Sequence, residues 1–202
     1  GKYEASQAGM KILQEGGNAV DAACAIGFAL GVVEPNSSGL GGGGFMTVRS
    51  ESGETVFIDF RERAPQAATP YLWATSTDAN GKMSVIGGQN ATGGKAVGIP
   101  GEVAGLCYAF EHYGSGKVTL KDIIQPSIDL CNNGYTVTPT LYNDMQSTYD
   151  SMVAYPEFGD LYLTKDGLNY QIGDTFKNPD MANALKMIAE NGKDAFYKGA
   201  MA

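Results

Sequence analysis

Apolar residues near the amino terminus recur with the spacing of an amphipathic helix. Ala8 and Ile12 lie on one face of a helix that we expect over residues 5–15. The pair Gly16-Gly17 follows, and glycine commonly ends helices because it adopts the left-handed backbone conformation without steric cost. The pattern therefore predicts a first helix that stops near Gly16.

A second helix has its own start and stop signals. Asn18 is a favoured N-cap residue, and Asp21 stands three positions later, where its carboxylate can reach back as in a capping box. The apolar pattern then runs to about Val33, and Glu34-Pro35 stops it. The two segments together predict a helical hairpin.

Two short runs rich in β-branched and aromatic residues come next. Residues 45–48 and 55–60 flank the turn-like segment Glu51-Ser52-Gly53-Glu54, so we expect a β-hairpin. Phe57 on one face of the second run and Ile58 on the other are both apolar. This strand is therefore expected to be covered on both faces, between two layers.

The rest of the chain has mainly helical patterns. Residues 69–94 are rich in Ser, Thr, Asn and Gly, which is typical of a long surface loop. We expect further helices over residues 98–113, 119–131, 139–152 and 179–191, and short strands over residues 161–164 and 170–172. Two substantial strands are too few for a self-contained sheet. The patterns predict a helix-rich α/β fold of the α+β type, in a single incomplete domain over residues 1–202.

The composition narrows the classes of partner. The 202 residues are 43% hydrophobic, enough for a substantial core, and their net charge of −8 without a basic cluster argues against nucleic acid. The most apolar stretch, residues 19–33, contains Asp21 and is shorter than the roughly 18–20 residues of a membrane span. It is expected to be a buried helix. No leader is visible, so a signal peptide is either absent or removed.

Cysteine and histidine provide no metal site in this sequence. Cys24, Cys107 and Cys131 stand singly within apolar helical patterns, without a CxxC motif, so we expect small core residues. His112 is the only histidine, and it stands at a predicted helix end, where interaction with the helix dipole is expected. We therefore expect neither a metal nor a cofactor.

Arg61 is the main candidate for binding chemistry. It ends the second predicted strand, where its guanidinium offers a rigid, permanently charged fork that fits a small carboxylate. The alternative is an exposed charge that contributes little to stability. Glu62 can pair with Arg63 or contact a substrate ammonium group, and Asp59 on the same strand face can orient Arg61.

A glycine-rich loop precedes the hairpin. The run Gly39-Leu40-Gly41-Gly42-Gly43-Gly44 formally matches G-x-G-x-x-G, but a dinucleotide site needs a strand before the loop and a helix after it, and here the order is reversed. A phosphate-binding P-loop is also excluded, because Phe45-Met46 follows in place of Lys and Ser or Thr. The glycines instead favour a tight turn and close backbone approach beneath a neighbouring site. Serine-hydrolase motifs are absent from the sequence.

Several of these segments together resemble the γ-glutamyltranspeptidase family. The resemblance spans essentially the whole chain and is specific in combination. It is carried by residues 5–9 (ASQAG), 16–23 (GGNAVDAA), 33–35 (VEP), 38–45 (SGLGGGGF), 59–65 (DFRERAP), 98–105 (GIPGEVAG) and 196–199 (FYKG).

The resemblance implies a fold and a reaction. Members are N-terminal-nucleophile hydrolases with a layered αββα fold, made as a precursor that cleaves itself before a threonine. That threonine attacks a γ-glutamyl amide such as glutathione, with its own α-amino group as base, and water or an amino acid then resolves the acyl-enzyme. By resemblance, Arg61 is the arginine that binds the donor α-carboxylate. Glu62 is the adjacent acid of the substrate-binding motif.

Other family elements are missing from this sequence. The threonine pair with a following histidine, the glycine pair that stabilises the oxyanion and most acceptors for the substrate amino group are absent. We expect the N-terminal portion of a large subunit, without catalytic residues and inactive alone. Its partners would be the remainder of the large subunit and the small catalytic subunit.

Two other functions stay open, as does the compartment. A cephalosporin acylase of the same family would prefer a glutaryl donor, which lacks the amino group. A non-catalytic scaffold or binding domain would keep the helical hairpin and glycine loop without turnover. The resemblance favours a periplasmic or extracellular location.

Overall fold

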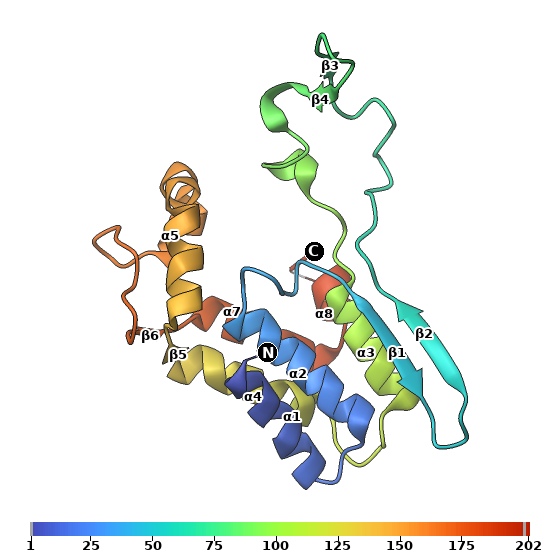
Figure 1. Cartoon of the computed structure of the whole chain (residues 1–202). Helices are drawn as coiled ribbons and strands as arrows, with labels where there is room; N and C mark the ends of the chain where they lie inside the picture. Colours follow the sequence, from blue (N-terminus) through green and yellow to red (C-terminus); the bar gives the residue numbers. More distant parts are fainter. Residues whose placement is uncertain (1, 200) are drawn as a thin grey trace.

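The computed structural model describes residues 2–199 and 201–202, and it begins with the expected helical hairpin. Helix α1 (Tyr3–Gln14) packs along α2 (Ala19–Val33), as Figure 1 shows. Asn18 Oδ1 accepts hydrogen bonds from the backbone of Val20 and Asp21, and Asp21 Oδ2 accepts one from Asn18 N at 2.8 Å. The capping box is therefore confirmed.

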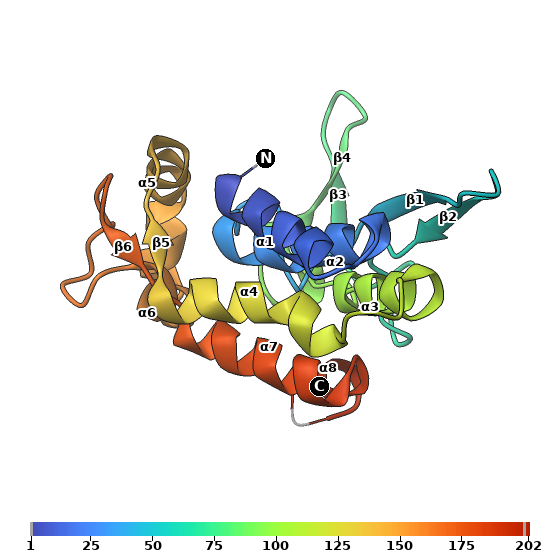
Figure 2. The same cartoon turned by 90° about the horizontal axis from the view of Figure 1, so that it is seen from below.

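Helix α2 lies at the centre of a helical layer. It contacts α3 (Glu102–Tyr113) on one side and α4 (Leu120–Asn133) on another, and α4 in turn packs on α7 (Pro179–Asn191), as Figure 2 shows. Phe28 on α2 is 1% exposed, so α2 is the buried helix that its apolar sequence predicted. None of the described helices is long and apolar enough to cross a membrane.

The hairpin of β1 (Phe45–Arg49) and β2 (Thr55–Asp59) rests on this layer by one face only. Ile58 points to the helices and is 9% exposed, whereas Phe57 is 64% exposed and stacks on Phe45 with ring centroids 5.6 Å apart. The prediction of a strand covered on both faces is thus wrong for the described chain. The apolar outer face is real, but no second layer lies over it among the described residues.

A long arm leaves the body after β2 and returns before α3 (Figure 1). The predicted surface loop lies in this arm, and it is mostly exposed, as expected. It has more structure than a plain loop: β3 (Thr75–Thr77) pairs antiparallel with β4 (Met83–Val85), and the short 3-10 turns η1 (Ile86–Gly88) and η2 (Gly94–Ala96) follow.

The carboxyl-terminal part corrects two predictions. The expected strands over residues 161–164 and 170–172 are absent, and a single bridge joins Leu163 to Asn169. The short sheet here instead pairs β5 (Tyr135–Thr136) with β6 (Thr175–Phe176). The helices of this part, besides α7, are α5 (Pro139–Ala154), α6 (Pro156–Tyr162) and α8 (Asp194–Tyr197). Proline at the first position of α6 favours a helix, and Tyr162 at its end stacks on Phe176 at 5.5 Å. The helix predicted from residue 98 begins only at Glu102.

The cysteines are core residues, as expected. Cys24, Cys107 and Cys131 are free and buried, and burial raises the pKa of the Cys24 and Cys131 thiols to about 12 and that of Cys107 to about 11. They are therefore neutral at physiological pH.

Asp21 gives a stability prediction. Besides its cap contact, Oδ2 accepts from Ser115 N at 2.9 Å, and the side chain is fully buried, so it joins α2 to the segment after α3. We expect Asp21→Ala to lower the free energy of unfolding by about 2 to 3 kcal/mol, measured by urea denaturation. Asp180→Ala, an exposed acid in the first turn of α7, should cost only about 0.5 kcal/mol. Equal losses in the two variants would contradict this role.

Candidate active site

Three backbone segments converge around Arg61. Phe60 N donates to Gly44 O at 3.1 Å, which joins the end of β2 to the glycine loop. Two further hydrogen bonds, Arg63 N to Ile99 O at 3.1 Å and Ile99 N to Arg63 O at 2.7 Å, join the other side of the turn to the segment before α3. The backbone of Arg61 is therefore held from both sides.

Glycines allow this convergence. Gly42 O accepts hydrogen bonds from Gly101 N at 2.8 Å and from Glu102 N at 3.0 Å, so the glycine loop lies against the start of α3. A Cβ atom on Gly101 would overlap the carbonyl oxygen of Phe60, and one on Gly43 would lie only 2.5 Å from the same oxygen. The expected close backbone approach is confirmed, and the loop leads into strand β1 as the sequence indicated.

The side chain of Arg61 projects from this fixed turn. It is 70% exposed, and its Nε lies 3.5 Å from Glu62 Oε2. The structure places Glu62 beside Arg61, and among the described residues it forms no ion pair with Arg63, the side-chain partner expected from the sequence. Asp59 Oδ1 accepts from Arg61 N at 3.0 Å, so Asp59 orients the backbone of the turn.

Two open hollows flank the turn. The hollow of about 430 Å³ between β2 and α3, here called the β2 hollow, is lined by Arg61, Arg63, Tyr108 and Lys193 among others. The hollow of about 500 Å³ beneath residues 37–43, here called the glycine-loop hollow, contains Glu62 and Glu102. Arg61 thus lines one hollow and Glu62 the other, and the contact between Arg61 Nε and Glu62 Oε2 brings their charges together at the turn between the hollows.

Glu102 was not identified from the sequence. It is half-buried in the first turn of α3, and burial together with the charge of Glu62 raises the pKa of its carboxyl to about 7. Its position after Gly98-Ile99-Pro100-Gly101 marked it only as the start of a helix. Its proximity to Glu62 depends on the convergence of three segments and could not be read from spacing.

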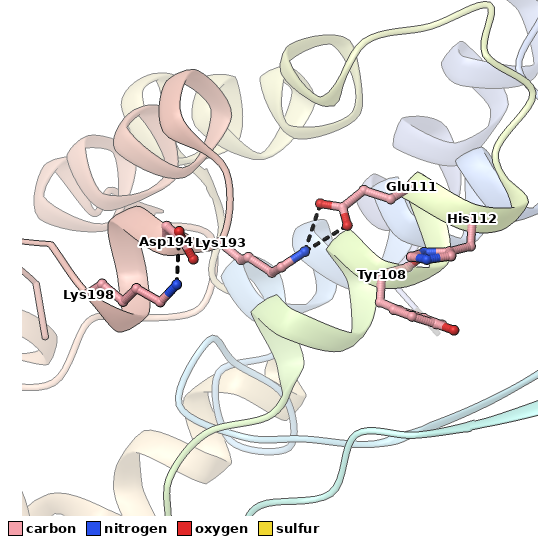
Figure 3. A network of polar contacts seen from close by, with 6 residues as sticks. All are labelled: Tyr108, Glu111, His112, Lys193, Asp194 and Lys198. Carbon is pink, nitrogen blue, oxygen red and sulfur yellow. Dashed lines mark hydrogen bonds and ion pairs between the residues drawn. The ribbon is translucent and has the colours of Figure 1, made fainter.

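A polar network beside the β2 hollow ties α8 to α3. Figure 3 shows Lys193 Nζ bonded to both carboxylate oxygens of Glu111, at 2.9 and 2.7 Å. Tyr197 OH donates to Pro100 O at 2.9 Å and accepts from Ala104 N at 3.2 Å, which fixes the start of α3. These contacts hold α8 against α3 and against the segment before α3, next to the β2 hollow.

His112 takes no part in these contacts. It lies in the last turn of α3, as predicted, with Nδ1 2.9 Å from Tyr108 O and its ring stacked on Tyr108 at 3.9 Å (Figure 3).

Comparison with known proteins identifies the family. The family model described as gamma-glutamyltranspeptidase matches residues 5–202. The glutathione hydrolase proenzyme of Escherichia coli is 41% identical over 199 residues, which cover 98% of this chain and 33% of the relative. The chain belongs to the γ-glutamyltranspeptidase family. The resemblance inferred from the motifs is therefore confirmed.

Solved structures agree with this family assignment. The crystal structure of Helicobacter pylori gamma-glutamyltranspeptidase matches with a TM-score of 0.91 and 38% identity, covering 100% of this chain and 56% of that chain. The helix-rich α+β class and the N-terminal-nucleophile hydrolase fold family are thus confirmed.

The family also contains acylases. An acylase proenzyme from a Pseudomonas species is 38% identical over 198 residues, 98% of this chain and 35% of the relative. The chain spans about a third of the length of these curated γ-glutamyltranspeptidase relatives, whose names mark them as proenzymes.

The glycine contact at Phe60 gives a prediction. We expect Gly101→Ala to destabilise the protein by about 2 kcal/mol, because the added methyl group overlaps the Phe60 carbonyl and must push β2 from the start of α3. Gly94→Ala is a matched control, since its Cβ would meet nothing within 4 Å and its backbone is not left-handed. Urea denaturation of both variants measures the difference. A Gly101→Ala protein as stable as the control would show that this approach is not a constraint.

Proposed function

We propose that this chain is the N-terminal portion of the large subunit of a γ-glutamyl transferase or hydrolase acting on γ-glutamyl amides of the glutathione type. The reaction would run through an acyl-enzyme on a threonine outside this chain, which alone would be inactive. Attack by the threonine hydroxyl forms the acyl bond and releases the amine, and water or an amino acid then takes the acyl group.

The placement of Arg61 carries this proposal. The backbone of this turn is held by hydrogen bonds from both sides, and the guanidinium, 70% exposed beside an open hollow, is accessible to a carboxylate. We assign to it the α-carboxylate of the γ-glutamyl donor. The alternative, an exposed charge without a binding role, does not account for the hydrogen bonds that hold the backbone on both sides of Arg61.

Glu62 would complete the donor site. Its Oε2 lies beside Arg61, which fixes the guanidinium from one side, and its carboxylate also faces the glycine-loop hollow. A γ-glutamyl group carries an ammonium next to its carboxylate, so a cation and an anion on adjacent residues match both charges of the donor.

A glutaryl acylase is the second candidate, favoured by the Pseudomonas acylase proenzyme at 38% identity. A glutaryl donor keeps a terminal carboxylate for Arg61 but has no ammonium for Glu62. Comparing kcat/KM for matched γ-glutamyl and glutaryl amides in the complete precursor separates the two. Preference for the glutaryl amide would replace the first proposal by the second.

The proposal names partners and a compartment. The remainder of the large subunit and the small catalytic subunit would be the macromolecular partners, and the uncovered outer face of β1 and β2, with Phe45 and Phe57 exposed, supports a further layer there. We place the enzyme in the periplasm or outside the cell. Fractionation of cells that express the complete gene tests the location.

Self-processing gives one test. When the complete gene is expressed, we expect intact-mass measurement and N-terminal sequencing to find two chains, the second beginning with threonine. A single uncut chain without turnover would favour the non-catalytic scaffold.

Substitution of Arg61 gives another test. In the complete enzyme, Arg61→Ala should lower kcat/KM for a γ-glutamyl donor by roughly 30-fold or more, because a charge-assisted contact of about 2 to 4 kcal/mol is lost. Arg61→Lys should recover only part of it, since a point charge replaces a fork. Arg49→Ala, at the opposite end of the same hairpin, is the control and should change little. Unchanged donor kinetics in Arg61→Ala would remove Arg61 from the site.

A further inference from the structure

Two carboxyl groups reach the two sides of Gly43. A Cβ atom on Gly42 would lie 3.8 Å from Glu62 Oε1, and one on Gly44 would lie 3.8 Å from Glu102 Oε2. Both acids line the glycine-loop hollow, one from the turn after β2 and one from the first turn of α3. The same loop that holds the Arg61 turn thus also holds both carboxyl groups near one another.

Glu62 is the charged side chain that acts on the carboxyl group of Glu102. The other ionisable groups that face it are Cys24 on α2 and Tyr197 on α8, and Tyr162 on α6 lines the same hollow. Burial raises the pKa of all three, so they are neutral near pH 7. Glu62 in turn is paired with Arg61, so a charge on Glu102 acts on that ion pair.

The two protonation states of Glu102 have different effects on this pair. When Glu102 is neutral, Glu62 is the lone carboxylate at the loop and its charge is directed to the guanidinium. When Glu102 ionises, two like charges meet in a half-buried space, which disfavours the Glu62 position beside Arg61 and adds negative potential near an anionic donor.

We propose that Glu102 is a positioning residue for the donor site: its neutral form keeps Glu62 beside Arg61, and its ionisation weakens capture of the donor carboxylate. This inference rests on the proposed function of Arg61. Because the pKa of Glu102 is raised to about 7, the change would fall within the physiological range.

The first test is a pH profile of the complete, processed enzyme. For the wild type we expect the KM for a γ-glutamyl donor to rise roughly three- to tenfold as pH increases through about 7, with less change in kcat. Glu102→Gln cannot ionise and should lose this rise, while Glu102→Asp, which keeps a carboxyl, should retain part of it. Dividing the wild-type profile by the Glu102→Gln profile cancels the titration of groups common to both, including the nucleophile.

The second test measures the same titration without turnover. The folded pKa of Glu102 lies above its ordinary value of 4.5, so the native state holds a proton that the unfolded chain releases, and its stability contribution is lost as pH rises from about 4.5 to about 7. Glu102→Gln should therefore raise Tm relative to the wild type more at pH 8 than at pH 5. Glu190→Gln, an exposed acid on α7, is the control and should show no such difference.

The outcomes separate this inference from the proposed function. Donor turnover with identical KM profiles in the wild type and Glu102→Gln would overturn the role of Glu102 and leave Arg61 in place. A Tm difference that does not change with pH would likewise overturn it. A processed wild-type enzyme with no turnover of γ-glutamyl or glutaryl amides at any pH would overturn the proposed function, and with it the positioning role.

Discussion

The close approach of Gly101 and Gly43 to the carbonyl oxygen of Phe60 is the constraint on which the site depends. No side chain larger than hydrogen fits at Gly101, which allows the end of β2, the glycine loop and the start of α3 to come together. The hydrogen bonds from Gly101 and Glu102 to Gly42 O then lock the three segments together. This backbone contact sets where Arg61, Glu62 and Glu102 leave the main chain, and the contact between Arg61 Nε and Glu62 Oε2 then brings two of the side chains together.

Local signals predicted much of the fold correctly. The capping box of Asn18 and Asp21 fixed the start of α2, and helix α7 has the bounds that Pro179 and the glycine after Asn191 indicated. Such signals act over a few residues, so the sequence carries them directly. The short strands near residues 161–172 were mispredicted because the aromatic residues there pack on Phe176, which lies outside both segments, so the pattern within each segment does not reveal the contact.

The sequence pointed to only some of the residues of the candidate site. Arg61 could be proposed from the sequence because a permanently charged fork at a strand end carries its chemistry with it. Glu102 could not, because a glutamate in the first turn of a helix is common and only the neighbouring Glu62 and burial make it unusual. Strand β2 does have apolar residues on both faces, as the sequence indicated. The inference that both faces are covered was wrong, because Phe57 has no layer over it in the described chain.

The bridge between Arg63 and Ile99 has a consequence for how sequences of this kind can vary. The arm leaves the body at one of these residues and returns at the other, and the two are already hydrogen-bonded to each other. The ends of the arm are therefore closed independently of what lies between them, and the entropy of closing a longer loop grows only slowly with its length. Insertions and deletions in the arm can therefore be accommodated while Arg61 keeps its place.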